Sequence, residues 1–215
     1  MKAVVFDMDG LMFNTEDVYT SVGQELLGRR GIEFTTELKD AIMGLPPRAC
    51  FEMMIQRLGL SGSWEALAEE SNEIFLELLP GRLAPMPGLM ELLDALEKAG
   101  IPKAIGTSTG RRLADACLTP LDMQRRFEFV LTSEDVVHGK PHPEIYLTAT
   151  KRLGVVPSEV VVLEDSQNGW RAAAAAGAFT VAVPGEHSRQ HDFSVASLVI
   201  DSLADTRLYE VLGLR

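Results

Sequence analysis

The sequence has 215 residues, which fits one large domain or one domain with a modest insert. Apolar residues make up 46% of it and charged residues 24%, a balance that supports a buried core and argues against disorder. The 31 acidic residues outnumber the 20 Lys and Arg residues, and the net charge of −11 opposes nucleic acid or an anionic membrane as a partner. A small anionic ligand is not excluded, because a local group of cations can outweigh the overall charge.

The patterns of a secretory signal and of a membrane span are not found. The N-terminus reaches Asp7 and Asp9 before an apolar stretch of secretory length has formed. The longest apolar run, 172–183, contains Gly177 and Thr180 and ends at Pro184, so it is too short to cross a bilayer. We expect a cytoplasmic protein, and we infer no obligate protein partner.

Short β-branched runs alternate with helical patterns along most of the chain. The runs predict buried strands at 3–6, 103–107, 129–132, 160–163, 180–183 and 198–200. The helical patterns at 89–96, 145–153 and 168–176 are each closed by a nearby glycine. This alternation predicts an α/β fold whose core is a Rossmann-like, doubly wound parallel sheet.

One interval, between Asn14 and Pro80, breaks the alternation. It contains no convincing strand but has helical patterns at 18–27, 51–58 and 64–79. So many helical residues exceed what a crossover between two strands needs. We therefore predict an inserted all-helical cap domain at 15–80, with residues 1–14 and 81–215 forming the α/β catalytic core.

Polar residues follow several predicted strands at their carboxyl ends, where ligands bind in an α/β sheet. They are Asp7 and Asp9 after the first strand, Thr107 and Ser108 after the second, Lys140 before a crossover helix, and Glu164 and Asp165 after the fourth. The carboxylates outnumber the lysine, which implies a divalent cation. Oxygen ligands without His or Cys favour Mg²⁺.

An oxygen-bound Mg²⁺, an ammonium and a hydroxyl suit the charged oxygens of a phosphoryl group. An ionised Asp7 can attack phosphorus and form an aspartyl phosphate. Asp9 can protonate the leaving alkoxide and then take a proton from water. Taken singly, each group could be a turn, a helix cap or a solvated charge. Their occurrence after successive strands favours a phosphoryl-transfer site.

Four segments together resemble the motifs of the haloacid dehalogenase superfamily, in order: 4–16 (VVFDMDGLMFNTE), 105–108 (IGTS), 139–146 (GKPHPEIY) and 162–166 (VLEDS). The helical insert after the first motif resembles the phosphatase and β-phosphoglucomutase branch. The resemblance implies Asp7 as nucleophile and Asp9 as general acid and base. It also implies that Thr107, Ser108 and Lys140 bind the phosphoryl group, and that Asp7, the Asp9 carbonyl, Asp165 and Glu164 bind Mg²⁺.

The insert resembles a lid over the substrate. Its segment from Gly44 to Arg48 resembles the family's cap loop, in which an arginine reaches the substrate, so both residues are expected to bind substrate. Arg111, just after the second motif, is expected to meet a second anionic group. The mutase type carries a histidine in the cap where this sequence has Tyr19, which favours hydrolysis over isomerisation.

The leading prediction is a Mg²⁺-dependent phosphatase that acts on a small phosphorylated metabolite, with a sugar phosphate as the first choice. A phosphohexose mutase is the alternative. A receiver-type phospho-switch domain also gathers acids, a hydroxyl and a lysine around Mg²⁺, but it is shorter and has no helical lid. A nicotinamide enzyme is disfavoured, because no G-x-G-x-x-G motif follows the first strand.

Overall fold

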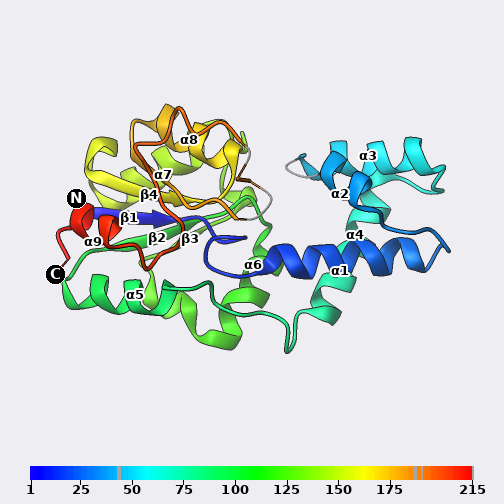
Figure 1. The fold of residues 1–215 in the computed structure, drawn as a ribbon, viewed down its shortest axis with the longest axis horizontal. Helices are drawn as coiled ribbons and strands as arrows, with labels where there is room; N and C mark the ends of the chain where they lie inside the picture. The colour runs from blue at the N-terminus through cyan, green and yellow to red at the C-terminus, as the bar shows by residue number, and fades with distance from the viewer. Residues whose placement is uncertain (43–44, 186–187, 190, 215) are drawn as a thin grey trace. The chain divides into compact units, whose positions relative to one another are not determined.

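The computed structural model describes residues 1–42, 45–185, 188–189 and 191–214, and its ribbon is drawn in Figure 1. The chain forms two compact units. One consists of Met1–Asn14 and Ala84–Arg215, and the other of Thr15–Leu83. The second unit therefore ends after Leu83, whereas the expected cap ended at residue 80.

The first unit is built on a parallel sheet. Its strands in the described part of the chain are β1 (Ala3–Phe6), β2 (Lys103–Gly106), β3 (Val130–Leu131), β4 (Val160–Glu164), β5 (Phe179–Ala182) and β6 (Leu198–Val199). They lie in the order β3-β2-β1-β4-β5-β6, and every neighbouring pair is parallel. All residues of β1, β2 and β4 are buried, as expected for strands covered on both faces. The α/β prediction is confirmed.

Helices lie on both faces of this sheet (Figure 1). On one face are α7 (Glu144–Leu153) and α8 (Gln167–Ala176), and on the other is α5 (Leu89–Lys98). The core under α7 and α8 includes Val5, Val162 and Tyr146. The sequence predicted these three helices. It did not predict α6 (Arg111–Leu118) or α9 (Thr206–Leu212), which are short.

The strand order creates one place where ligands are expected to bind. From β1 the chain moves outward through β2 to β3, and from β4 it moves the other way through β5 to β6. The carboxyl ends of β1 and β4 therefore form a topological switch point. Phe6 pairs with Leu163, so Asp7 and Glu164 come next to each other at this point.

The second unit contains helices and connecting loops, and no strand, among the residues that the structure describes there. It consists of α1 (Thr15–Gly28), α2 (Thr36–Ile42), α3 (Pro47–Leu58) and α4 (Trp64–Leu78). Helices α1 and α4 pack together, and the ring of Tyr19 lies 4.7 Å from that of Phe75. The sequence did not predict α2, whose one buried residue, Leu38, leaves little periodic signal. None of the helices in the described part of the chain is long and apolar enough to cross a membrane.

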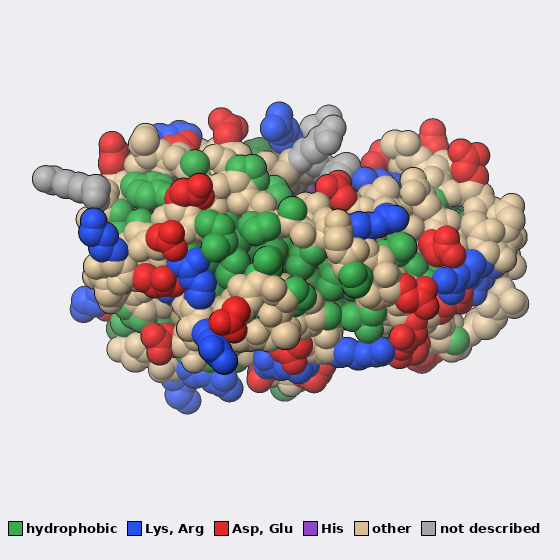
Figure 2. Space-filling view, turned by 90° about the horizontal axis from the view of Figure 1, so that it is seen from below, with side chains coloured by type: hydrophobic (Ala, Val, Ile, Leu, Met, Phe, Trp, Pro, Cys, Tyr) green, Lys and Arg blue, Asp and Glu red, His purple; other side chains and the backbone are tan. Residues whose placement is uncertain are grey.

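Charged side chains of both signs mix on the surface. Figure 2 shows Lys and Arg beside Asp and Glu over one face, with apolar side chains between them. Among the ion pairs of the described residues, Arg126, at the end of a short 3₁₀ helix (Met123–Arg126), contacts Asp94 and Glu97 on α5. Lys103 of β2 lies 3.1 Å from the same Glu97 carboxylate. These ion pairs connect α5 to β2 and to the 3₁₀ helix.

Candidate active site

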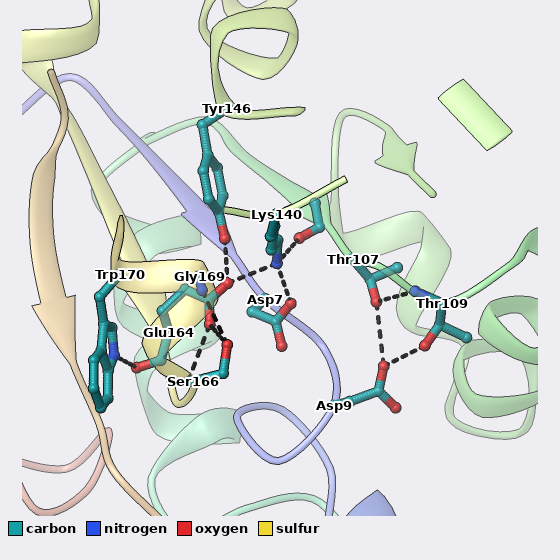
Figure 3. A network of polar contacts seen from close by, with 11 residues as sticks. Asp7, Asp9, Thr107, Thr109, Lys140, Tyr146, Glu164, Ser166, Gly169 and Trp170 are labelled. Atoms are coloured by element: carbon teal, nitrogen blue, oxygen red, sulfur yellow. Dashed lines mark hydrogen bonds and ion pairs between the residues drawn. The ribbon is translucent and has the colours of Figure 1, made fainter. Parts of the chain in front are cut away.

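A buried lysine lies between two buried carboxylates at the switch point (Figure 3). The ammonium nitrogen Nζ of Lys140 is 2.5 Å from Oδ1 of Asp7 and 2.6 Å from Oε1 of Glu164. It also donates to the carbonyl of Gly106 at 2.9 Å. The side chains of Lys140, Asp7 and Glu164 are 5%, 9% and 0% exposed, so these charges interact with little screening by water.

The backbone of the sheet places these groups. The amide of Asp7 donates to Leu163 at 3.0 Å, which continues the ladder between β1 and β4 beyond the end of β1. Glu164 is the last residue of β4, and its carbonyl accepts from Val183 at 2.7 Å and from the indole of Trp170 at 3.0 Å. Trp170 is fully buried on α8, so the helix anchors the backbone of Glu164.

Asp9 lies on the other side of Asp7, in the loop that follows β1. Its Oδ2 accepts hydrogen bonds from the hydroxyls of Thr107 at 3.2 Å and Thr109 at 2.6 Å. The Thr107 hydroxyl in turn accepts from the amide of Thr109 at 3.1 Å. The other oxygen, Oδ1, is buried and has no hydrogen-bond partner among the described residues. One oxygen of Asp9 is thus held while the other is available.

The burial of the cluster changes the proton affinities of its members. Burial, the nearby Glu164 carboxylate and Asp9 raise the pKa of Asp7 well above its ordinary value, although Lys140 works in the opposite direction. Burial alone would lower the pKa of Lys140, but Asp7 and Glu164 outweigh it and the pKa is raised. Burial and Glu164 raise the pKa of the Tyr146 phenol. Lys140 and Tyr146 therefore stay protonated donors.

The acids fit a hard divalent cation. One oxygen each from Asp7, Glu164 and Asp165 can lie within 4.8 Å of the others. Asp7 and Glu164 contact the ammonium of Lys140, Asp165 lies beside both, and Asp9 adds a negative charge near Asp7, so these acids outnumber Lys140. The potential ligand atoms are all oxygens, which suits Mg²⁺. The unpartnered Oδ1 of Asp9 also leaves a buried acceptor beside this group.

The other residues expected at the site lie in different surroundings. Ser108 is exposed next to the buried Thr107. The guanidinium of Arg111 contacts Asp135 at 2.8 Å and the carbonyl of Val130 at 3.1 Å, and these contacts compete with binding of an anion. Arg48 is exposed in the helical unit and pairs with Glu52 at 2.8 Å. Gly44 lies outside the described residues. The substrate-binding roles of all four stay predictions.

Three residues around the cluster had no role assigned from the sequence. Tyr146 donates its hydroxyl to Oε1 of Glu164 at 2.5 Å, Thr109 binds Asp9, and Gly169 packs against the Glu164 carboxylate. A signal existed for Tyr146, because a tyrosine on the buried face of a helix needs a partner for its hydroxyl. The partners themselves could not be named without the strand order.

A sequence model of a family described as haloacid dehalogenase-like hydrolase matches residues 4–183. The chain is 38% identical over 181 residues to the phosphorylated carbohydrates phosphatase of Thermotoga maritima. The alignment covers 82% of each of the two chains. It is 31% identical over 176 residues to the fructose-1-phosphate phosphatase YqaB of Escherichia coli, covering 81% of this chain and 92% of YqaB.

A solved structure has the same fold. CbbY from Rhodobacter sphaeroides in complex with phosphate superposes with a TM-score of 0.84 and 26% identity. The superposition covers 95% of this chain and 96% of CbbY. The likeness therefore extends over both units, including the helical one.

Proposed function

Because the chain belongs to the haloacid dehalogenase-like hydrolase family and is a phosphoric monoester hydrolase, we propose that its substrate is a small sugar phosphate. We propose that hydrolysis uses Mg²⁺ and passes through an aspartyl phosphate on Asp7. The two phosphatases to which it is similar are named for phosphorylated carbohydrates and for fructose 1-phosphate. Both names support a phosphorylated sugar as the substrate class.

The observation that carries the proposal is the pair formed by Asp7 and Lys140 beside Asp9. Lys140 lies 2.5 Å from Asp7 and so can bind the oxygens of a phosphoryl group that reaches the same carboxylate. Asp9 follows Asp7 by two residues, and its Oδ1 has no hydrogen-bond partner in the part of the chain that the structure describes. A nucleophile, a cation and a proton donor are thus available to the phosphoryl group of one substrate.

The reaction has two proposed steps. In the first, a carboxylate oxygen of Asp7 forms a bond to phosphorus while the ester P–O bond breaks, and Asp9 gives its proton to the leaving alkoxide. In the second, Asp9 takes a proton from water, the water oxygen bonds to phosphorus and the bond to Asp7 breaks. Inorganic phosphate leaves and both carboxylates return to their starting states.

Mg²⁺, when bound, would supply positive charge that favours the ionised form of Asp7 and neutralises phosphoryl oxygens. Asp7, Glu164, Asp165 and the carbonyl of Asp9 would hold it. Thr107 would bind the phosphoryl group with Lys140. We propose that the helical unit acts as the cap and that its Arg48 contacts the sugar part of the substrate.

The direct test is phosphate release from a panel of sugar phosphates, nucleotides and an aryl phosphate, with Mg²⁺ and with a chelator. We expect release that favours a sugar phosphate, stops with the chelator and returns when Mg²⁺ is added in excess. Release that the chelator leaves unchanged would contradict the role of the metal. A clear preference for nucleotides would contradict the substrate class.

The same assay distinguishes a phosphohexose mutase from a phosphatase. A mutase converts one hexose phosphate isomer to another and needs a bisphosphate primer. Isomer conversion without steady phosphate release would replace the phosphatase proposal. Tyr19, which packs on Phe75 where a mutase carries a histidine, supports hydrolysis. A cytoplasmic location stays a prediction of the sequence.

A further inference from the structure

The carboxylate of Glu164 is held by donors on both of its oxygens (Figure 3). Oε1 accepts from Nζ of Lys140 at 2.6 Å and from the hydroxyl of Tyr146 at 2.5 Å. Oε2 accepts from the hydroxyl of Ser166 at 3.1 Å and from its amide at 3.3 Å. The residue is 0% exposed, so water does not compete for these contacts. Its orientation is therefore determined by its neighbours.

Tyr146 contacts both members of the Glu164–Lys140 pair. It lies on α7 with no exposed surface, and its hydroxyl donates to Glu164. Nζ of Lys140 lies 5.1 Å from the centre of its ring, within the range of a cation–π contact. Removal of the hydroxyl alone would leave the ring and this contact in place, so the hydrogen bond can be tested separately.

Gly169 also bounds the carboxylate. A Cβ atom at this position would lie 1.8 Å from Cδ of Glu164 and 1.9 and 2.0 Å from its two oxygens. These distances are far below van der Waals contact, so any side chain at 169 would occupy the place of the carboxylate. Gly169 also donates its amide to the Ser166 hydroxyl at 3.1 Å, which connects it to the group that binds Oε2.

We propose that Tyr146 and Gly169 are positioning residues, which act through Glu164 to direct Lys140 toward Asp7 and to place the carboxylates for the divalent cation. Movement of Glu164 would remove one of the two carboxylates that hold the Lys140 ammonium. It would also change the spacing of the oxygens that Asp7, Glu164 and Asp165 offer to a metal. The inference rests on the proposed function.

The first test compares Tyr146→Phe with Tyr209→Phe, the same change on α9. The melting temperature of the full chain is measured as Mg²⁺ is added, which reports metal binding without turnover. We expect the Mg²⁺ concentration that gives a fixed rise in melting temperature to be about tenfold higher for Tyr146→Phe and to stay unchanged in the control. The kcat for an aryl phosphate should fall while its KM changes little.

A second pair of variants moves the same carboxylate through a different contact. Gly169→Ala is compared with Gly28→Ala at the end of α1, where no atom beyond its chain neighbours and its own helix backbone lies within 4 Å of the added methyl. Gly169→Ala should raise the Mg²⁺ requirement as Tyr146→Phe does, and Gly28→Ala should not. If Tyr146→Phe and Gly169→Ala both behave as their controls do, the inference is wrong.

A third measurement does not depend on the metal. Urea unfolding of Tyr146→Phe, Glu164→Gln and the double variant tests whether the two side chains are coupled. We expect the shift in midpoint of the double variant to be smaller than the sum of the single shifts, and a fully additive result would overturn the inference. Absence of both Mg²⁺ binding and phosphate release in the unmodified chain would overturn the proposed function, and the coupling would still decide whether Tyr146 holds Glu164.

Discussion

The hydroxyl of Thr109 donates a 2.6 Å hydrogen bond to Oδ2 of Asp9, although the two residues are 100 positions apart in the sequence. Thr107 binds the same oxygen at 3.2 Å, and Oδ1 has no partner among the described residues. The two threonines thus orient the carboxylate so that one oxygen remains available for the proton transfer that we propose for Asp9.

Thr109→Val removes this hydrogen bond with little change in shape, so Asp9 should be held less well. We expect kcat to fall about tenfold, a fraction of what a general acid and base contributes, with a smaller change in KM. Thr109→Ser keeps the hydroxyl and should retain most of the activity. Equal loss in both variants would show that the methyl group, and not the hydrogen bond, matters.

Asp7→Asn replaces the proposed nucleophile with an amide of nearly the same size. Turnover of every ester should fall by at least about 1,000-fold, because an amide cannot form the aspartyl phosphate. The circular dichroism spectrum should be unchanged. A variant that still releases phosphate at a substantial fraction of the original rate would refute the assignment of Asp7.

Arg48→Ala tests the proposed role of the helical unit in binding the substrate. A lost charged hydrogen bond should raise the KM for the preferred sugar phosphate about tenfold or more, while the KM for a small aryl phosphate changes little. Arg57→Ala, an arginine change on the same helix α3, serves as the control. Equal effects on both substrates would remove Arg48 from the substrate site.

Gly88→Ala should destabilise the α/β unit. Gly88 has φ of 85° just before α5, and a Cβ there would lie 2.3 Å from the amide nitrogen of Ala204. We expect the free energy of unfolding to fall by about 3 kcal/mol from left-handed strain and the clash with backbone. Gly213→Ala, with φ of 73° and open space, should cost only about 1 kcal/mol. Urea unfolding measures both, and similar losses would show that the clash is relieved.

Glu97 should make a pH-dependent contribution to stability. Its hydrogen bonds with Arg126, and then with Lys103, lower its pKa from 4.5 to about 2. Since the folded protein favours the ionised form, the contribution is complete above pH 4.5 and is lost as the pH falls toward 2. The contribution is modest because the carboxylate is partly exposed.

Urea unfolding of Glu97→Gln and of the unmodified chain, from neutral pH down to pH 2, measures the contribution of Glu97 to stability. The difference in free energy of unfolding should be constant near neutral pH and should shrink below pH 4.5. A difference that stays constant down to pH 2 would show that the ion pairs do not cause it.

Much of the fold could be predicted from local patterns. The apolar runs of β1 and β4 and the glycines that close α7 and α8 are signals carried by consecutive residues. The short helices α2, α6 and α9 were missed, because seven or eight residues hold too few periodic positions.

The sequence by itself determined which chemical groups are available. Asp7 and Asp9 come after one strand, Glu164 ends another and Lys140 precedes a crossover helix, and strands in a parallel sheet end at one edge. Only the tertiary structure decided which of them touch. Lys140 meets Asp7 across 133 positions, and Tyr146 meets Glu164 across 18. These contacts depend on the order of the strands and on the absence of a side chain at Gly169, and both are properties of packing between distant segments.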